Sequence, residues 1–291
     1  MRKNRQFIIG SSDGRTRYFH VVSRTAGKRI LFGDDERETF RKILFKQLKF
    51  SGLRALAWCF MGNHFHLLLE LPDKELALEG WTEDDLIDRL SVLKDEFSTR
   101  MILGDVEMFR GNGHADGVSE IANRVRERLF DLSAFMKELK QKFSIAYNFK
   151  HGRSGTLWEG RYKSTLVDSD NYFFTVSRYI ELNPVRAEMV SNPAQYRWSS
   201  HRSNAQGYPC GLLAPHELYQ RLGKTTEARQ RQYSKFFEEE LSAEILEDLR
   251  YATNRSWAFG SEEFLARIAS VANRRPDSRG RGGDRRLSQG V

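Results

Sequence analysis

Residues 58–70 of this 291-residue chain have the sequence WCFMGNHFHLLLE. Runs of apolar and aromatic residues on both sides of segment 61–63 predict two strands. The Met-Gly-Asn of that segment predicts a tight turn, in which glycine and asparagine would supply positive φ values. Pro72 ends the second strand. The sequence therefore predicts an antiparallel hairpin of strands 53–60 and 64–71.

Two histidines lie two residues apart in the second of these strands. Side chains alternate between the faces of a strand, so His64 and His66 project to one face and Phe65 projects to the other. Two imidazoles on one face can chelate a divalent ion. A buried histidine is more often a hydrogen-bonded core residue, so the pair alone leaves both interpretations open.

The segments around the hairpin complete the pattern of a ferredoxin-like fold. We expect strands at 18–23 and within 152–167, core helices at 36–50 and 132–150, and a third helix at 170–182. Strand, helix, strand, strand, helix, strand, helix is the order of a ferredoxin-like α+β sandwich with one added helix. We therefore expect an antiparallel sheet with helices on one face, plus an added helix that carries Tyr179.

Composition divides the rest of the chain into further parts. Residues 73–132 are charge-rich and predict a largely helical insertion within a core of residues 1–205. Residues 206–272 predict a mostly helical C-terminal extension. Residues 273–291 are rich in Arg, Gly and Ser, and we expect this tail to be disordered.

Charge and cysteine content limit the classes of function. The net charge of +8 makes a polyanion a reasonable partner, although many proteins without such a partner are mildly basic. Cys59 and Cys210 are the only cysteines and lie far apart, which excludes a disulfide framework and a cysteine-based zinc site. No apolar stretch has the length of a membrane span or of a signal peptide, so we expect a cytoplasmic protein.

Residues 178–186, with the sequence RYIELNPVR, hold a second chemical feature at the end of the third core helix. Tyr179 and Asn183 share a helix face if the helix continues that far, but Pro184 biases Asn183 away from helical backbone. A tyrosine hydroxyl can form a covalent phosphoester, and an asparagine oxygen can bind a hard divalent ion. A helical tyrosine taken alone is usually a packing residue. With the histidine pair, it predicts a phosphodiester site in which Tyr179 attacks phosphorus.

Five segments, in this order, resemble those of REP-associated tyrosine transposases, a branch of the single-tyrosine HUH transposases (His, hydrophobic residue, His). They are YFHVVSR (18–24), MGNHFHLLL (61–69), GRYKS (160–164), RYIELNPVRA (178–187) and YRWSS (196–200). The resemblance implies an endonuclease and strand transferase that cuts single-stranded, hairpin-containing DNA with Mg²⁺ or Mn²⁺. It implies a covalent link from tyrosine to the DNA 5′ phosphate and a free 3′ hydroxyl.

By position, the resemblance implies His64 and His66 as metal ligands, Asn183 as a third ligand and Tyr179 as the nucleophile. Single-strand binding combines a cationic groove with aromatic faces on which bases stack. The residues of this character near the predicted site are Arg24, Lys28, Arg29, Arg153, Trp158, Arg161, Tyr162 and Lys163. For Trp158 and Tyr162 a core position is an equal alternative, and the cations could form a solvated face.

Three functions stay open at this point. The first is an active DNA transposase, and the second is a domesticated relative that binds DNA hairpins without cutting them. The third is a structural zinc site on the histidine pair. We expect single-stranded or hairpin DNA as partner, no membrane, and a monomer or homodimer. The sequence leaves open whether Tyr179 completes its own site or that of a partner.

Overall fold

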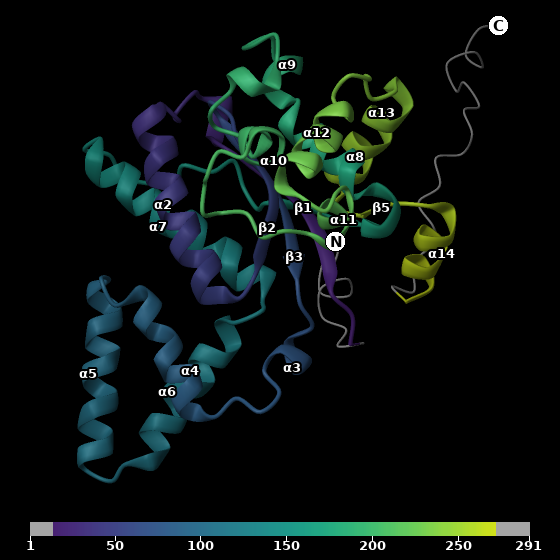
Figure 1. Ribbon diagram of the computed structural model, residues 1–291. Helices are drawn as coiled ribbons and strands as arrows, with labels where there is room; N and C mark the ends of the chain where they lie inside the picture. The colour runs from purple at the N-terminus through teal and green to yellow at the C-terminus, as the bar shows by residue number, and fades with distance from the viewer. Residues whose placement is uncertain (1–13, 272–291) are drawn as a thin grey trace, which may run out of the picture.

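The computed structural model describes residues 14–271 and has an α+β fold (Figure 1). Its five-stranded sheet has the order β2-β3-β1-β4-β5. The strands are β1 (Arg17–Arg24), β2 (Arg54–Phe60), β3 (His64–Leu71), β4 (Lys163–Val167) and β5 (Ala258–Phe259). Neighbouring strands are antiparallel, except that β4 and β5 are parallel. The first four strands have the order and directions of a ferredoxin-like sheet, so the predicted fold class is confirmed.

The helices fall into groups around this sheet (Figure 1). They are α2 (Asp34–Ser51), α3 (Lys74–Ala77), α4 (Glu83–Asp88), α5 (Phe97–Gly111), α6 (Ala115–Arg128), α7 (Leu132–Lys150), α8 (Ser169–Glu181), α9 (Asn183–Arg186), α10 (His201–Gln206), α11 (Glu217–Arg221), α12 (Thr226–Lys235), α13 (Ala243–Arg255) and α14 (Glu262–Val271). Short 3-10 turns lie at η1 (Ala26–Lys28), η2 (Arg89–Leu93) and η3 (Pro193–Gln195). The predicted tail at 273–291 lies outside the described residues.

One face of the sheet is covered by α2 and α7, as Figure 1 shows. Phe40 of α2 and Phe143 of α7 recur on the apolar sides of their helices and are almost completely buried. The Phe40 ring lies 4.7 Å from that of Phe65 and 5.3 Å from that of Phe143, measured between centroids. Phe65 therefore faces the helices, and strand alternation turns its two histidine neighbours to the opposite face.

The hairpin turn at residues 61–63 differs from its prediction. Neither Gly62 nor Asn63 has a positive φ. The turn is instead held from outside, because the Gly62 carbonyl accepts from the amides of Leu31 and Phe32 at 3.0 Å each. A Cβ on Gly62 would lie 3.2 Å from the side chain of Ile30, so close approach of the 25–32 loop, not left-handed backbone, favours glycine here.

Helices α4, α5 and α6 form a lobe with a core of its own, seen at the lower left of Figure 1. The buried side chains include Leu90, Val106 and Val125, and Phe50 at the end of α2 joins them. None of the helices between residues 14 and 271 is long and apolar enough to cross a membrane.

Two later segments extend the sheet. The predicted helical extension contains a strand, β5, that was not expected. It pairs in parallel with β4, and the Leu166 amide donates to the Trp257 carbonyl at 2.9 Å. At the other edge, residues 196–200 lie along β2, where the Ser200 amide donates to the Trp58 carbonyl at 2.9 Å. Both edges of the ferredoxin-like sheet are therefore covered.

A matched pair of substitutions in α7 tests the packing of the sheet on its helices. Phe143→Ala removes a ring that is 1% exposed, and we expect a loss of about 3–5 kcal/mol in unfolding free energy. Phe149→Ala, on the same helix, removes a ring that is 90% exposed and should change it by about 0.5 kcal/mol or less. Urea unfolding followed by circular dichroism measures both. Equal losses would contradict the packing described here.

Candidate active site

A cleft of about 570 Å³ opens on the face of the sheet that α8 and α13 cover. Its floor comes from β1 and β3, and its walls come from residues 159–163, α8 and α13. The lining residues are Val22, Ser23, Arg24, His66, Glu159, Gly160, Arg161, Lys163, Tyr179, Arg250, Thr253 and Asn254. The cleft therefore joins the segment of the histidine pair to the C-terminal extension.

The two predicted imidazoles lie side by side in β3, with ring centroids 5.0 Å apart. His64 Nδ1 lies 2.6 Å from Asn63 Oδ1, while Asn63 Nδ2 donates to the Lys28 carbonyl at 2.9 Å. Because that second bond identifies Oδ1 as an acceptor, His64 Nδ1 must carry the proton. The other ring nitrogen of His64, Nε2, is then left with a lone pair that can bind a metal ion.

A third histidine, His20 of β1, lies behind the pair. Its Nε2 is 2.9 Å from His66 Nδ1, and the two rings stack with centroids 5.2 Å apart. Burial, and next the positive charge of Arg186, lowers the pKa of His20 to about 3. Burial, and next the charge of Arg24, lowers the pKa of His64 to about 4, and burial also lowers the pKa of His66. All three rings are therefore neutral at pH 7.

Tyr179 of α8 lies over the histidines of the same chain. Its ring centroid is 5.9 Å from that of His66 and 5.7 Å from that of His20, both in edge-on contact. The helix that carries it spans residues 169–181, close to the predicted 170–182. Burial of Phe173, Val176 and Ile180 fixes which side of α8 faces the sheet, and this brings Tyr179 to the imidazoles.

Arg186 holds the other side of the tyrosine. Its guanidinium carbon lies 4.4 Å from the ring centroid of Tyr179, and Nη2 donates to the Tyr179 carbonyl. The cation–π contact orients the ring and places a positive charge beside the phenol. This residue was not among the predicted site residues, although it stands seven positions after Tyr179, two helical turns along the chain.

Asn183 lies one turn after Tyr179, but its amide points back to its own helix. Nδ2 donates to the carbonyls of Tyr179 at 3.0 Å and Ile180 at 3.2 Å, which satisfies the exposed end of α8. Pro184 does not stop the helical path, because it occupies the first turn of α9, where proline is tolerated. The metal-ligand role of Asn183 stays a prediction, and the structure assigns the residue a capping role.

Three of the six predicted DNA-binding cations, Arg24, Arg161 and Lys163, line this cleft. Lys28 and Arg29 are exposed in the loop after β1. The Ala26 amide of this loop donates to the Leu157 carbonyl at 2.8 Å, which joins the loop to the segment between Arg153 and Arg161. Arg153 is also exposed, with its guanidinium 5.8 Å from the Tyr147 ring.

Trp158 and Tyr162 are buried, at 7% and 9% exposure. Trp158 Nε1 donates to Ser144 Oγ at 2.9 Å, and the Tyr162 hydroxyl lies 3.2 Å from Ser133 Oγ. Base stacking needs an open ring face, and neither ring has one in this structure. Their burial supports the alternative interpretation, in which both are packing residues between α7 and the sheet.

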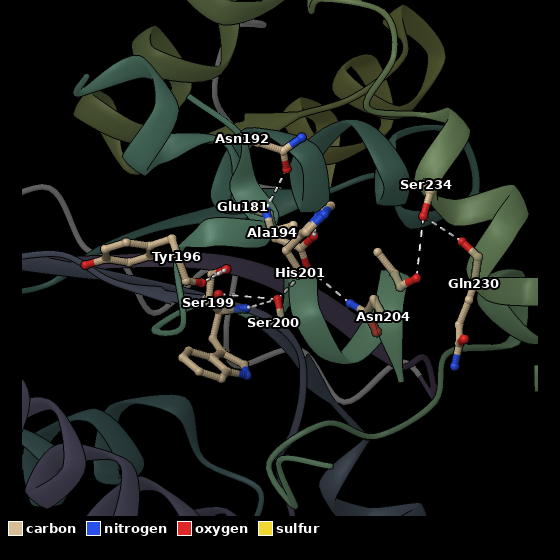
Figure 2. A network of polar contacts seen from close by, with 12 residues as sticks. Glu181, Asn192, Ala194, Tyr196, Ser199, Ser200, His201, Asn204, Gln230 and Ser234 are labelled. Carbon is tan, nitrogen blue, oxygen red and sulfur yellow. Dashed lines mark hydrogen bonds and ion pairs between the residues drawn. The ribbon is translucent and has the colours of Figure 1, made fainter. Parts of the chain in front are cut away.

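A buried carboxylate anchors the tyrosine helix, as Figure 2 shows. Glu181 is fully buried and accepts from Ser200 Oγ and from Asn204 Nδ2, and His201 Nδ1 lies 3.2 Å from Oε2. Ser200 Oγ also accepts from the Trp58 amide at 2.9 Å. Glu181 therefore ties the end of α8 to α10 and, through Ser200, to β2.

Besides Arg186, sequence reasoning missed several polar side chains around the cleft, among them His20, Arg250, Thr253 and Asn254. His20 stands in a strand whose alternation turns it to the face of His66, a signal that the motif at 18–24 contained. Arg250, Thr253 and Asn254 recur at positions i, i+3 and i+4, so they share one face of α13. In the sequence, that face has the pattern of a solvent-exposed helix surface. Only the packing of α13 in the folded protein shows that it lines the cleft.

Comparisons with known proteins give one structural likeness. No protein-family model and no curated protein sequence matches the chain. A solved structure of a REP-associated tyrosine transposase bound to a REP hairpin is similar to it at a TM-score of 0.40, with 18% sequence identity. The match covers 69% of this chain and 87% of that one. What the protein can do is therefore inferred from the residues of its cleft.

Substitution of Glu181 tests the anchor of the tyrosine helix. Glu181→Ala removes the acceptor of the Asn204 amide and leaves the buried Ser200 hydroxyl only its longer contact to the Trp58 carbonyl, at 3.3 Å. We expect the unfolding free energy to fall by about 3 kcal/mol. Glu238→Ala removes an exposed carboxylate after α12 and should change it by about 0.5 kcal/mol or less. Urea unfolding measures both variants. A loss below about 1 kcal/mol for Glu181→Ala would rule out the anchor.

Proposed function

We propose that the protein is a metal-dependent nuclease and strand transferase for single-stranded, hairpin-containing DNA that acts through Tyr179. The observation that carries the proposal is the position of this tyrosine, which contacts two imidazoles of its own chain in a cleft rimmed by arginine and lysine. A phenol beside neutral imidazoles and cations suits attack on a phosphodiester. The preference for a hairpin follows the family resemblance of the sequence.

The two β3 histidines fit a divalent ion. Their rings are adjacent and neutral, and the proton on His64 lies on the nitrogen that faces Asn63. Within residues 14–271 no group of three or more His, Cys, Asp or Glu side chains is arranged to hold a metal ion. His64 and His66 would therefore hold Mg²⁺ or Mn²⁺ together with oxygen ligands, such as water and the substrate phosphate. The bound ion supplies Lewis-acid polarisation of a phosphate oxygen.

In the proposed reaction, Tyr179 is the nucleophile and Arg186 orients its ring. A bond forms from Tyr179 Oη to phosphorus while the bond from phosphorus to the 3′ oxygen breaks. The phenolic proton ends on that oxygen, which leaves a 3′ hydroxyl and a 5′-phosphotyrosine. Arg186 keeps the Tyr179 ring oriented during the step. In the reverse step, a different 3′ hydroxyl attacks the phosphotyrosine and Tyr179 is released. This joins two DNA strands and is the strand-transfer half of the activity.

One observation favours a second candidate, a protein that binds hairpin DNA without cutting it. The Tyr179 side chain is only 8% exposed. A phosphodiester must reach its hydroxyl through the cleft, whereas the rim cations are open to DNA in any case. A structural zinc site is the least supported candidate, because such sites use four ligands and the described residues offer two.

Covalent capture distinguishes the first two candidates. With labelled hairpin DNA and Mn²⁺, a DNA adduct that survives a denaturing gel should form and should be lost in Tyr179→Phe. Tyr172→Phe, a half-buried tyrosine two turns earlier on α8, is the matched control and should keep the adduct. An adduct in Tyr179→Phe would eliminate this nucleophile. Hairpin binding with no adduct under any divalent ion would establish the second candidate.

Binding to single-stranded DNA tests the rim contributed by α13. Arg250 lines the cleft, and its removal in Arg250→Ala should weaken binding severalfold at 0.1 M salt. The slope of log affinity against log salt should fall in magnitude by about 0.7, the value for one lost phosphate contact. Arg231→Ala, on the exposed side of α12, should leave affinity and slope unchanged. Fluorescence anisotropy across a salt series measures both.

A further inference from the structure

Helix α5 presents an apolar stripe to solvent at the edge of the α4–α6 lobe (Figure 1). Phe97, Met101 and Met108 form the stripe, and each of them is more than half exposed. Thr99 and Val106 lie about 200° around the helix from Phe97 and Met108, and both are buried. The inner side of α5 therefore packs in the lobe, while its outer side is open to a partner.

A glycine lies in the middle of the stripe. With Gly104 included, positions 97, 101, 104 and 108 are spaced by four, three and four residues, which is the heptad spacing of two helices that pack along one seam. A Cβ on Gly104 would meet no atom of another element within 4 Å, so packing within residues 14–271 does not require glycine here. Glycine inside a helix is destabilising relative to alanine. Close approach of a second helix gives its missing side chain a use.

Polar and charged residues flank the stripe. Arg100 and Glu107 lie on one flank, about two turns apart, and both are exposed. Ser98 and Asp105 lie on the other flank and are also exposed. Within residues 14–271 the salt bridge of α5 is made by Arg110, so Arg100 and Glu107 are not paired inside the chain.

The apolar positions match a second copy of the same helix. When two α5 helices run antiparallel about a two-fold axis, Phe97 of each copy meets Met108 of the other. A thioether against an aromatic ring is a favourable contact. In the same register Met101 of each copy lies over Gly104 of the other, where the absent side chain leaves room for it.

The flanking charges match in that register as well. Arg100 of each copy faces Glu107 of the other, because residues on this flank pair across the seam of an antiparallel helix pair. The two-fold axis makes this salt bridge twice. On the second flank, Ser98 of each copy faces Asp105 of the other, a hydroxyl donor opposite a carboxylate. Apolar fit and charge therefore select one register and one direction.

We propose that α5 is a self-association surface, through which two copies of this chain form an antiparallel helix pair. The stripe from residue 97 to residue 108 is about 17 Å long at 1.5 Å per residue. An interface of this length lies at the small end of specific interfaces, so the dimer forms with a dissociation constant on the order of 10 μM.

The dimer leaves each candidate active site whole. Tyr179 contacts His66 of its own chain, so neither copy depends on the other for this pair. Figure 1 shows α5 well apart from α8 and α13, the helices that border the cleft. Both clefts therefore stay open in the dimer. If the proposed function holds, self-association brings two DNA-cutting sites into one particle.

Sedimentation equilibrium of the full-length protein without DNA or metal tests the surface. Between about 1 and 200 μM we expect a monomer–dimer equilibrium. Phe97→Ala should weaken the dimer at least about tenfold, since it removes an apolar contact that the two-fold axis makes twice. Phe149→Ala removes an exposed ring of α7 outside the stripe and should leave the dimer unchanged. A protein that stays monomeric at about 200 μM, or a dimer that Phe97→Ala does not weaken, would overturn the proposal.

Charge exchange tests the register. Arg100→Glu and Glu107→Arg each place like charges opposite one another, and each should weaken the dimer about tenfold. An equimolar mixture of the two variants should associate about as tightly as the unaltered protein, because every carboxylate then faces a guanidinium. Circular dichroism checks that both variants are folded. A mixture that associates no better than either variant alone would overturn the antiparallel pair.

Two further points keep these outcomes decisive. If one single variant does not fold, the double variant Arg100→Glu/Glu107→Arg replaces the mixture, and it should dimerise like the unaltered protein. Because the measurements contain neither DNA nor metal, they are independent of the proposed function. A DNA adduct from a strictly monomeric protein would refute self-association alone, and a dimer that forms no adduct would refute the nuclease alone.

Discussion

The pairing register of β1 against β3 is the constraint on which the site depends. His66 lies opposite Val22, and this register turns the imidazoles of β3 toward α8. A slip of one residue would turn them toward α2 and α7 and would expose Phe65 to the cleft. Because Phe65 is fully buried against Phe40, apolar packing on one face selects the register. The hydrophobic core thereby determines where the polar chemistry of the other face can occur.

The tyrosine helix must then be fixed on that second face. Tyr179 and Glu181 are two residues apart, so their side chains point in directions about 200° apart around α8. A buried carboxylate is unfavourable unless its oxygens are satisfied, and Glu181 meets Ser200, His201 and Asn204. These partners leave few rotations of α8 that keep the network intact. The network therefore aims Tyr179 at the histidines although it does not touch them.

Local sequence patterns predicted much of the fold and the part of the site that β3 contributes. The hairpin, the core helices and the alternation of His64 and His66 depend on short-range periodicity, and each is found within one or two residues of its expected bounds. What local patterns did not decide depends on contacts between distant segments. Trp158, for which a core position was an open alternative, is buried because α7 packs over it. A Cβ on Gly62 would lie close to the side chain of Ile30, and α13 packs on β4 beside the cleft. A solvated helix face and the wall of a cleft have the same sequence pattern, so periodicity alone does not distinguish them.

In the proposed function, the cations of the cleft have two effects that would be expected to conflict. A rim of arginine and lysine would attract the DNA backbone, whereas a metal site needs ligands that are not protonated. Here the two requirements support each other. Burial lowers the pKa values of the three histidines, and the positive charges of Arg24 and Arg186 lower them further. Arg24, which lines the cleft, disfavours a protonated imidazole beneath it and, in the proposed function, attracts a phosphate. Burial is the larger cause, and together with these charges it keeps the imidazoles neutral at pH 7.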